Sequence, residues 1–116
     1  MPSATVAIDR AYHVYVIELA PAARRVTRVM SANPDARRDR PVLYVGMTGR
    51  TPQLRFEQHM SGYKSSWLVR RHGLRLRHDL MLVHGVGPLA TQAEGLAEEA
   101  RLTEALREAG YAVWSN

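Results

Sequence analysis

The chain has no cysteine and no long apolar run. Without thiols it can form neither a disulfide nor a thiolate metal site, and cysteine nucleophiles are excluded. No segment approaches the roughly 18 consecutive apolar residues that a membrane-spanning helix requires. The first ten residues also lack the basic start and apolar core of a signal peptide. We therefore expect a cytoplasmic protein that has no membrane partner.

Several common functional motifs are missing as well. The sequence has no G-x-S-x-G, no P-loop and no dinucleotide fingerprint, and its histidines lack the H-x-x-x-H spacing of a zinc site. It also has no internal repeat or low-complexity tract. At 116 residues the chain has the size of one domain, so we expect residues 1–116 to form a single domain.

Positive charge is concentrated in the middle of the chain. The net charge is +5, but residues 24–77 hold thirteen lysines and arginines against three acids, whereas residues 78–116 hold two arginines against six acids. A basic segment of that density attracts polyanions, and phosphate backbones are the commonest target. The alternative is an arginine-rich surface that only keeps the protein in solution.

Two strands and a basic excursion are expected in the first half. Residues 12–19 are rich in β-branched and aromatic residues and are apolar on both faces, which predicts a strand in the middle of a sheet. Residues 42–45 predict a second strand, antiparallel to the first, which places Tyr15 near Tyr44. Between them, at about 20–41, lies a segment with six arginines. Its pattern leaves open a mobile arm or a long two-stranded excursion.

A helix with an unusual polar face follows the second strand. Thr51 is a suitable N-cap and Pro52 a suitable first helical residue. Arg55 and His59 are four residues apart, so the helical repeat stacks them on one face. A cation and an imidazole therefore share one surface just beyond a strand that carries a tyrosine.

The rest of the chain predicts two further helices and two further strands. Residues 65–72 predict a short helix that ends at a glycine cap, and residues 74–83 predict a third strand. A helix at 91–109 opens with the capping box T-Q-A-E and ends at Gly110. Residues 111–114 predict a last strand or a docked tail. We therefore expect a small α/β (α+β) domain with a three-stranded, mainly antiparallel sheet flanked by helices.

Glu99 differs from the other acids of the last helix. On a helical wheel it falls inside the apolar stripe, whereas four other glutamates fall on the polar side with Arg101. The stripe consists of Leu96, Leu102, Thr103 and Leu106. An unpaired carboxylate among these residues costs several kcal/mol. We therefore expect Glu99 to pair with an arginine, to bind a metal ion or to lie at the rim of a cleft.

Four short motifs, in this order, carry a resemblance to a known family: His13-Val14-Tyr15, Tyr44-Val45-Gly46 with Thr48, Arg55 with His59, and Gly95-Leu96-Ala97-Glu98-Glu99 followed by Leu102. In this order and register, from about residue 12 to its end, the chain resembles the GIY-YIG nuclease domain. It departs from that pattern in three places: a histidine replaces the glycine of the first motif, valines replace the isoleucines of both motifs, and the excursion between the strands is longer than usual. Family members often have an asparagine near the final strand, to which Asn116 would correspond.

The resemblance implies a metal-dependent nuclease that hydrolyses nucleic-acid phosphodiester bonds, with DNA as the expected substrate. It implies that Tyr15 and Tyr44 are paired tyrosines, one of which helps to deprotonate the attacking water. Arg55 would hold the scissile phosphate, and His59 would assist proton transfer or phosphate positioning. Glu99 would bind Mg²⁺ or Mn²⁺, and a single such acid does not favour a two-metal site.

Two other functions remain open from the sequence. One is a catalytically silent nucleic-acid-binding module of the same fold, which the substitution at His13 favours because the larger side chain can crowd the cleft. The other is a protein-interaction domain in which Trp67 and Trp114 serve the core. A small domain of this kind often depends on a partner protein for targeting. The basic residues expected to contact nucleic acid are Arg37, Arg38, Arg50, Lys64, Arg70 and Arg71.

Overall fold

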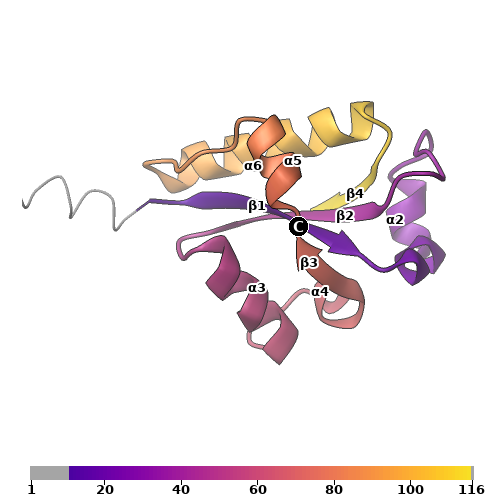
Figure 1. Ribbon diagram of the computed structural model, residues 1–116, viewed down its shortest axis with the longest axis horizontal. Coiled ribbons are helices and arrows are strands. Elements are labelled where there is room, and N and C mark those ends of the chain that lie inside the picture. The colour runs from indigo at the N-terminus through magenta and orange to yellow at the C-terminus, as the bar shows by residue number, and fades with distance from the viewer. Residues whose placement is uncertain (1–10, 116) are drawn as a thin grey trace, which may run out of the picture.

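A four-stranded mixed sheet forms the centre of the computed structural model, which describes residues 11–115 (Figure 1). The strands lie in the order β3-β1-β2-β4, with the bounds β1 His13–Leu19, β2 Val42–Thr48, β3 Gly73–Leu76 and β4 Ala112–Ser115. β1 is antiparallel to both β2 and β3, and β4 is parallel to β2. The α+β class is confirmed. The predicted count of three strands is wrong, because the chain after the last helix returns to the free edge of β2 and adds a fourth.

Helices cover both faces of the sheet. On one face lie α5 (His78–Val83) and α6 (Gln92–Glu108), and the other face is covered by α3 (Pro52–Ser61) and α4 (Trp67–His72) together with the basic excursion (Figure 1). The central strand β1 supplies both cores, because its side chains alternate between the faces. Tyr15 and Ile17 pack on the α4 side, and Val14 and Val16 pack on the α6 side. A central strand that is apolar on both faces is thereby confirmed.

The basic excursion folds as two short helices, so neither the mobile arm nor the two-stranded form is correct. They are the 3-10 helix η1 (Pro21–Arg25) and the helix α2 (Thr27–Ser31). Each contributes one fully buried side chain, Ala23 and Val29, to the core that contains the two tyrosines. These apolar residues hold the segment against the sheet, while its arginines remain at the surface.

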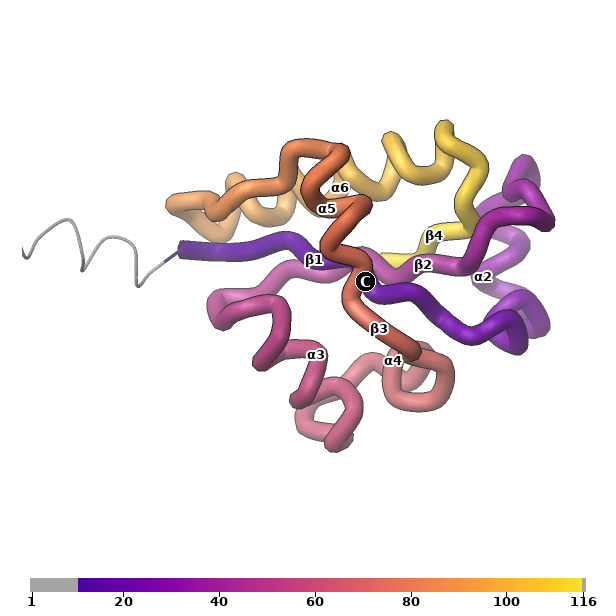
Figure 2. Tube along the Cα trace, viewed as in Figure 1, coloured from indigo at the N-terminus to yellow at the C-terminus, as the bar shows by residue number. Residues whose placement is uncertain are grey.

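Asn33 closes the outer edge of β4. Its side-chain amide donates to the carbonyl of Val113 at 2.9 Å, and its Oδ1 accepts the backbone N–H of Val113 at 2.9 Å. Figure 2 shows the excursion beside the C-terminal strand, although the two are far apart in the sequence. The buried side chain of Asn33 therefore hydrogen-bonds to the backbone N–H and C=O groups at the outer edge of β4, as a neighbouring strand would.

The predicted caps of the two longer helices are present. The Thr51 hydroxyl accepts the backbone N–H of Leu54 at 3.1 Å, and Gly62 ends α3 with a φ of +90°. Thr91 and Glu94 form the capping box of α6, and Gly110 follows its end with a φ of +98°. The left-handed φ of these two glycines is the conformation that a helix end favours.

Residues 74–83 are not one strand. β3 ends at Leu76 and α5 begins at His78. The predicted strand was therefore too long, because only the first residues of this apolar run alternate as a strand does. Arg77 marks the break: its guanidinium forms salt bridges with Glu18 on β1 at 3.0 Å and with Asp79 in the first turn of α5 at 2.8 Å. The predicted short helix is α4, which ends at His72 with Gly73 as its C-cap; Gly73 has an extended backbone, with a φ of −64°, and starts β3 directly.

Trp67 does not serve the core. Its side chain is 52% exposed, whereas the next two residues of α4, Leu68 and Val69, are buried. Trp114 is partly buried and packs against the core beside Tyr44. No helix in the described part of the chain is long and apolar enough to cross a membrane.

Candidate active site

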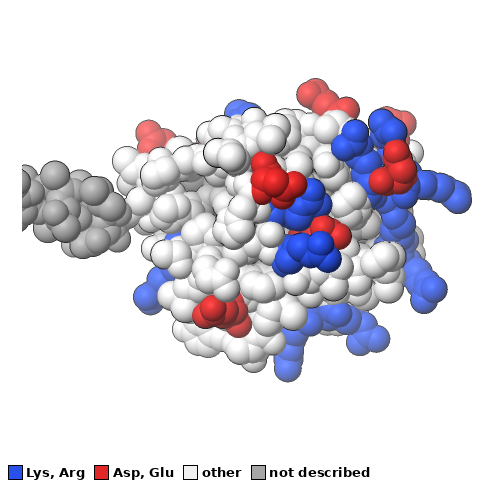
Figure 3. Space-filling model, viewed as in Figure 1, with Lys and Arg blue, Asp and Glu red and all other residues white. Residues whose placement is uncertain are grey.

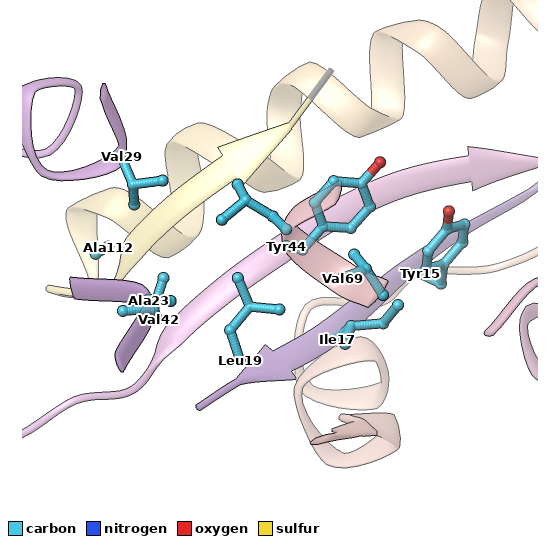
Figure 4. Packing of buried hydrophobic residues seen from close by; sticks show 10 residues of the cluster. Tyr15, Ile17, Leu19, Ala23, Val29, Val42, Tyr44, Val69 and Ala112 are labelled. Carbon is cyan, nitrogen blue, oxygen red and sulfur yellow. The ribbon is translucent and has the colours of Figure 1, made fainter. Parts of the chain in front are cut away.

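Tyr15, Tyr44 and His59 form a buried cluster between the sheet and α3. The ring centroids of Tyr15 and Tyr44 are 6.3 Å apart, and that of His59 lies 6.1 Å from the first and 5.7 Å from the second. The register explains the pair, because Tyr44 lies opposite Ile17, two residues from Tyr15 on the same face. In Figure 4 the two tyrosine rings point their hydroxyls in the same direction, away from Leu19.

The Tyr15 ring lies across Gly46 on the neighbouring strand. Tyr15 and Gly46 are directly paired, and a Cβ on Gly46 would be 2.4 Å from the Tyr15 hydroxyl oxygen. Beyond Val45, β2 has no further partner in β4, whose described pairing ends at Ser115. The missing side chain therefore leaves room for the Tyr15 hydroxyl over Gly46, next to the part of β2 that β4 does not pair with in the described residues.

Gly46→Ala is expected to displace the Tyr15 hydroxyl. The ring is 2% exposed and cannot move freely, so the new methyl group should cost about 1–3 kcal/mol of unfolding free energy. Because positioning is lost, any cleavage activity should fall by about 10²-fold. Gly49→Ala is the matched control, since its Cβ would meet the Tyr12 ring at an ordinary 3.5 Å. Equal activity of the two variants would contradict this role of Gly46.

His59 is held in one tautomer. The backbone N–H of Ser66 donates to its Nδ1 at 3.0 Å, so Nδ1 carries a lone pair. In the neutral ring the proton is then on Nε2, which lies 2.9 Å from the Tyr15 hydroxyl oxygen. His59 therefore donates to Tyr15 and cannot accept its proton, and the Tyr15 O–H is left to donate elsewhere.

Burial keeps His59 neutral. Desolvation, assisted by the positive charge of Arg55, lowers the pKa of His59 to about 4, and the side chain is 1% exposed. In the unfolded chain the imidazole takes up a proton near pH 6.5. Between those two values the unfolded state binds more protons than the folded state, so the contribution of His59 lowers stability as the pH falls.

We expect the unfolding free energy to fall by about 2–3 kcal/mol from this residue as the pH is lowered from 7 to 4. Urea unfolding of the wild type and of His59→Gln at several pH values measures the effect, since the variant should have the shallower dependence. His78→Gln, at an exposed position on α5, should follow the wild type. Parallel curves for the wild type and His59→Gln would contradict the assignment.

Arg55 is fixed by the loop that follows α3. Its guanidinium donates to the carbonyl oxygens of Tyr63 at 3.2 Å and Lys64 at 2.7 Å, and to Oε1 of Gln58 at 3.3 Å. Lys64 has a φ of 44°, which is uncommon for a residue with a side chain. The same loop carries Ser66, so one segment orients both Arg55 and His59. Sequence reasoning missed Ser66, because a backbone donor leaves no signal in residue type.

Glu99 is half-buried on α6. Burial raises the pKa of its carboxyl above the usual value, and within residues 11–115 it belongs to none of the salt bridges. Of the three alternatives that the sequence left open for Glu99, the ion pair with an arginine is therefore not formed there. The helical wheel was correct for Leu102, Thr103 and Leu106 but wrong for Leu96, which is 51% exposed.

Tyr44, Arg55 and Glu99 all shift the pKa of Tyr15, and His59 hydrogen-bonds to its hydroxyl. Burial raises the pKa of Tyr15 most, and Tyr44 raises it further. Arg55 lowers it through its charge and a hydrogen bond, while the charge of Glu99 raises it. Charged and polar groups of β2, α3 and α6 thus all act on the protonation of Tyr15 on β1.

The predicted nucleic-acid contacts divide into two groups. Arg37 forms a salt bridge with Asp39 at 2.7 Å and lines a pocket of about 520 Å³ at the far end of α6, so it is not beside the tyrosines. The others are exposed and, in the described part of the chain, form no salt bridge: Arg38, Arg50, Lys64, Arg70 and Arg71. Lys64 belongs to the loop that orients Arg55, and the Arg70 guanidinium lies beside Gly62 at the start of that loop.

His13 lies two residues before Tyr15 on the same face of β1, so the substitution in the first motif is adjacent to the cluster. Asn116 lies outside the described residues. Among residues 11–115 there is no group of three or more histidine, aspartate or glutamate side chains that could hold a metal ion.

No family model, curated protein or solved structure matches the chain.

Proposed function

We propose that this protein is a metal-dependent nuclease of the GIY-YIG type, with DNA as the expected substrate and the cytoplasm as its location. The observation that carries the proposal is the buried cluster of Tyr15, Tyr44 and His59, with the charges of Arg55 and Glu99 acting on the Tyr15 hydroxyl. These residues belong to four elements, β1, β2, α3 and α6. Titratable groups that shift one another's pKa values gather preferentially at functional sites.

Arg55 is the phosphate-binding group in this proposal. Hydrolysis of a phosphodiester places additional negative charge on the phosphate oxygens, and a guanidinium is always charged and binds such oxygens in a bidentate manner. Its hydrogen bonds to two carbonyl groups of the following loop and to Gln58 on α3 fix the orientation of the guanidinium before substrate binds. Little conformational entropy is then lost when the phosphate arrives.

Tyr15 is the group that takes the proton of the attacking water. It does so as the phenolate, which is a small fraction at neutral pH because burial raises its pKa. His59 supports this form, since its Nε2–H is directed at the same oxygen and stabilises negative charge there. His59 is therefore a positioning residue, and the proton-transfer role expected from the resemblance is not the one that its tautomer favours.

Glu99 suits a single divalent cation. Mg²⁺ is commonly held through one or two carboxylates, with water and substrate oxygens completing the coordination, and Glu99 is a half-buried carboxylate outside any ion pair among the described residues. When bound, the cation supplies charge neutralisation at the leaving oxygen and offsets the effect of Glu99 on the pKa of Tyr15.

A silent nucleic-acid-binding module is the second candidate. The observation that favours it is the raised pKa of Tyr15, which makes a poor base at neutral pH. In that case the unpaired cations around α4 would still bind a phosphate backbone, and binding would weaken with salt.

One experiment separates the two functions. The protein is incubated with labelled single-stranded, duplex and branched DNA and with RNA, in Mg²⁺, in Mn²⁺ or in chelator, and products are resolved on denaturing gels. The nuclease predicts metal-dependent products, which Arg55→Ala should reduce by about 10³-fold and Arg55→Lys by somewhat less. Binding without a product from any substrate supports the silent module.

A further inference from the structure

Trp67 has a large exposed surface that folding does not require. It is the first residue of α4, and α4 docks on the sheet through the next two residues, Leu68 and Val69. The indole ring is 52% exposed. A single exposed apolar residue needs no explanation, so the residues around it decide whether it has a role.

Trp67 is surrounded by cations. The Arg28 guanidinium lies 5.4 Å from its ring centroid and 5.7 Å from that of Trp114, and Arg71 lies 6.0 Å from the Trp67 ring. A hollow of about 290 Å³ is bounded by Trp67, Arg70 and Arg71. In Figure 3, positive side chains gather at the lower edge of the molecule, where Figure 1 places α4.

These cations have no acidic partner. Within residues 11–115, Arg28, Arg70 and Arg71 take part in no salt bridge, so their charges are not neutralised by a neighbouring carboxylate. The paired arginines are Arg37, Arg75, Arg77, Arg101 and Arg107. An unpaired cationic and aromatic surface is complementary to an anionic polymer that carries flat rings.

The surface is continuous with the candidate active site. Trp67 directly follows Ser66, whose N–H holds the His59 ring. Trp114 lies opposite Tyr44 in the pairing of β2 and β4, so their side chains are neighbours on one face. Trp67 is therefore linked along the chain to the loop that orients His59, and through Arg28 and Trp114 to the strand that carries Tyr44.

The geometry points to an unpaired nucleobase as the occupant of this surface, and this inference rests on the proposed nuclease function. Bases stack on tryptophan and on guanidinium planes, and arginines hold the adjoining phosphates. Except at its two ends, a duplex has both faces of each base already stacked, so an unpaired base is the group that offers a free face to Trp67. We propose that the substrate has a single-stranded or unpaired segment next to the cleaved bond.

The test is equilibrium binding of labelled oligonucleotides to the full chain in chelator, where no metal-dependent cleavage occurs. The ligands are a single strand, the blunt duplex of the same sequence, and that duplex with a short unpaired flap, each as DNA and as RNA. The wild type should bind the single strand and the flap more tightly than the blunt duplex. Trp67→Ala should weaken the first two by roughly 5- to 150-fold and leave the blunt duplex nearly unchanged.

Two controls make the result specific. Trp67→Phe keeps a stacking ring and should bind within a few-fold of the wild type. Leu82→Ala removes another exposed apolar side chain, on α5 at the opposite face, and should have no effect. Four results would overturn the proposal. Trp67→Ala could bind as tightly as the wild type, or bind all three ligands more weakly by the same factor. The wild type could bind no oligonucleotide, or it could self-associate in a way that Trp67→Ala abolishes. Because binding is measured without metal, this outcome is independent of whether the protein cleaves.

Discussion

Glu99→Gln should abolish metal-dependent cleavage and leave the fold at least as stable as the wild type. The amide keeps the shape of the side chain but is a much weaker ligand for Mg²⁺, so the cleavage rate should fall by about 10³-fold. Stability should not fall, because burial raises the pKa of this carboxyl and the charged form is therefore disfavoured in the folded state. Single-turnover kinetics and thermal unfolding measure the two effects.

The pairing of those two effects makes the prediction discriminating. If Glu99 had only a structural role, its substitution by glutamine would lower both stability and activity. If it were an ordinary surface residue, the substitution would lower neither. Glu108→Gln is the matched control, because Glu108 lies at an exposed position on the same helix. A Glu99→Gln variant that still cleaves at the wild-type rate, or that melts well below the wild type, contradicts the assignment.

Tyr15→Phe should reduce cleavage by about 10²- to 10⁴-fold, the usual contribution of a positioned proton acceptor. It should also cost about 1–3 kcal/mol of unfolding free energy, because the buried Nε2–H of His59 loses its acceptor. The pH dependence provides a further check. As the pKa of Tyr15 is raised above its usual value near 10, the phenolate fraction and the wild-type rate should increase about tenfold per pH unit between pH 7 and 9.

Tyr111→Phe is the control for the loss of stability. Tyr111 accepts a hydrogen bond from Arg40 at 3.2 Å, beside the far end of α6, so its removal should destabilise the protein without affecting catalysis. A flat pH–rate profile from pH 7 to 9, or equal activities of the two variants, would exclude Tyr15 as the proton acceptor.

Sequence patterns predicted those parts of the fold that local chemistry determines. The caps at Thr51 and Thr91 were predictable because a hydroxyl three residues before a backbone N–H is a local feature. The central position of β1 followed from its two apolar faces. The excursion did not, because Ala23 and Val29 bury against residues distant in the sequence and no local period marks them. The break at Arg77 depends on Glu18, more than fifty residues away.

The candidate site likewise has parts that the sequence predicts and parts that it does not. Arg55 and His59 were placed on one surface by helical spacing, and Glu99 was singled out because it conflicts with its own stripe. The parts that only three-dimensional geometry reveals are the ones that orient these groups. They are the space above Gly46, the left-handed backbone of Lys64 and the backbone N–H of Ser66. Each acts through the position of the backbone, which residue type does not predict.

The most direct measurement compares cleavage and binding for three proteins on one substrate. Single-turnover cleavage in Mg²⁺ is followed for the wild type, Tyr15→Phe and Glu99→Gln, and binding of the same oligonucleotide is measured in chelator. The proposed site predicts that all three bind with similar affinity and that only the wild type forms product at an appreciable rate. Product from all three at one rate, or from none, would contradict it.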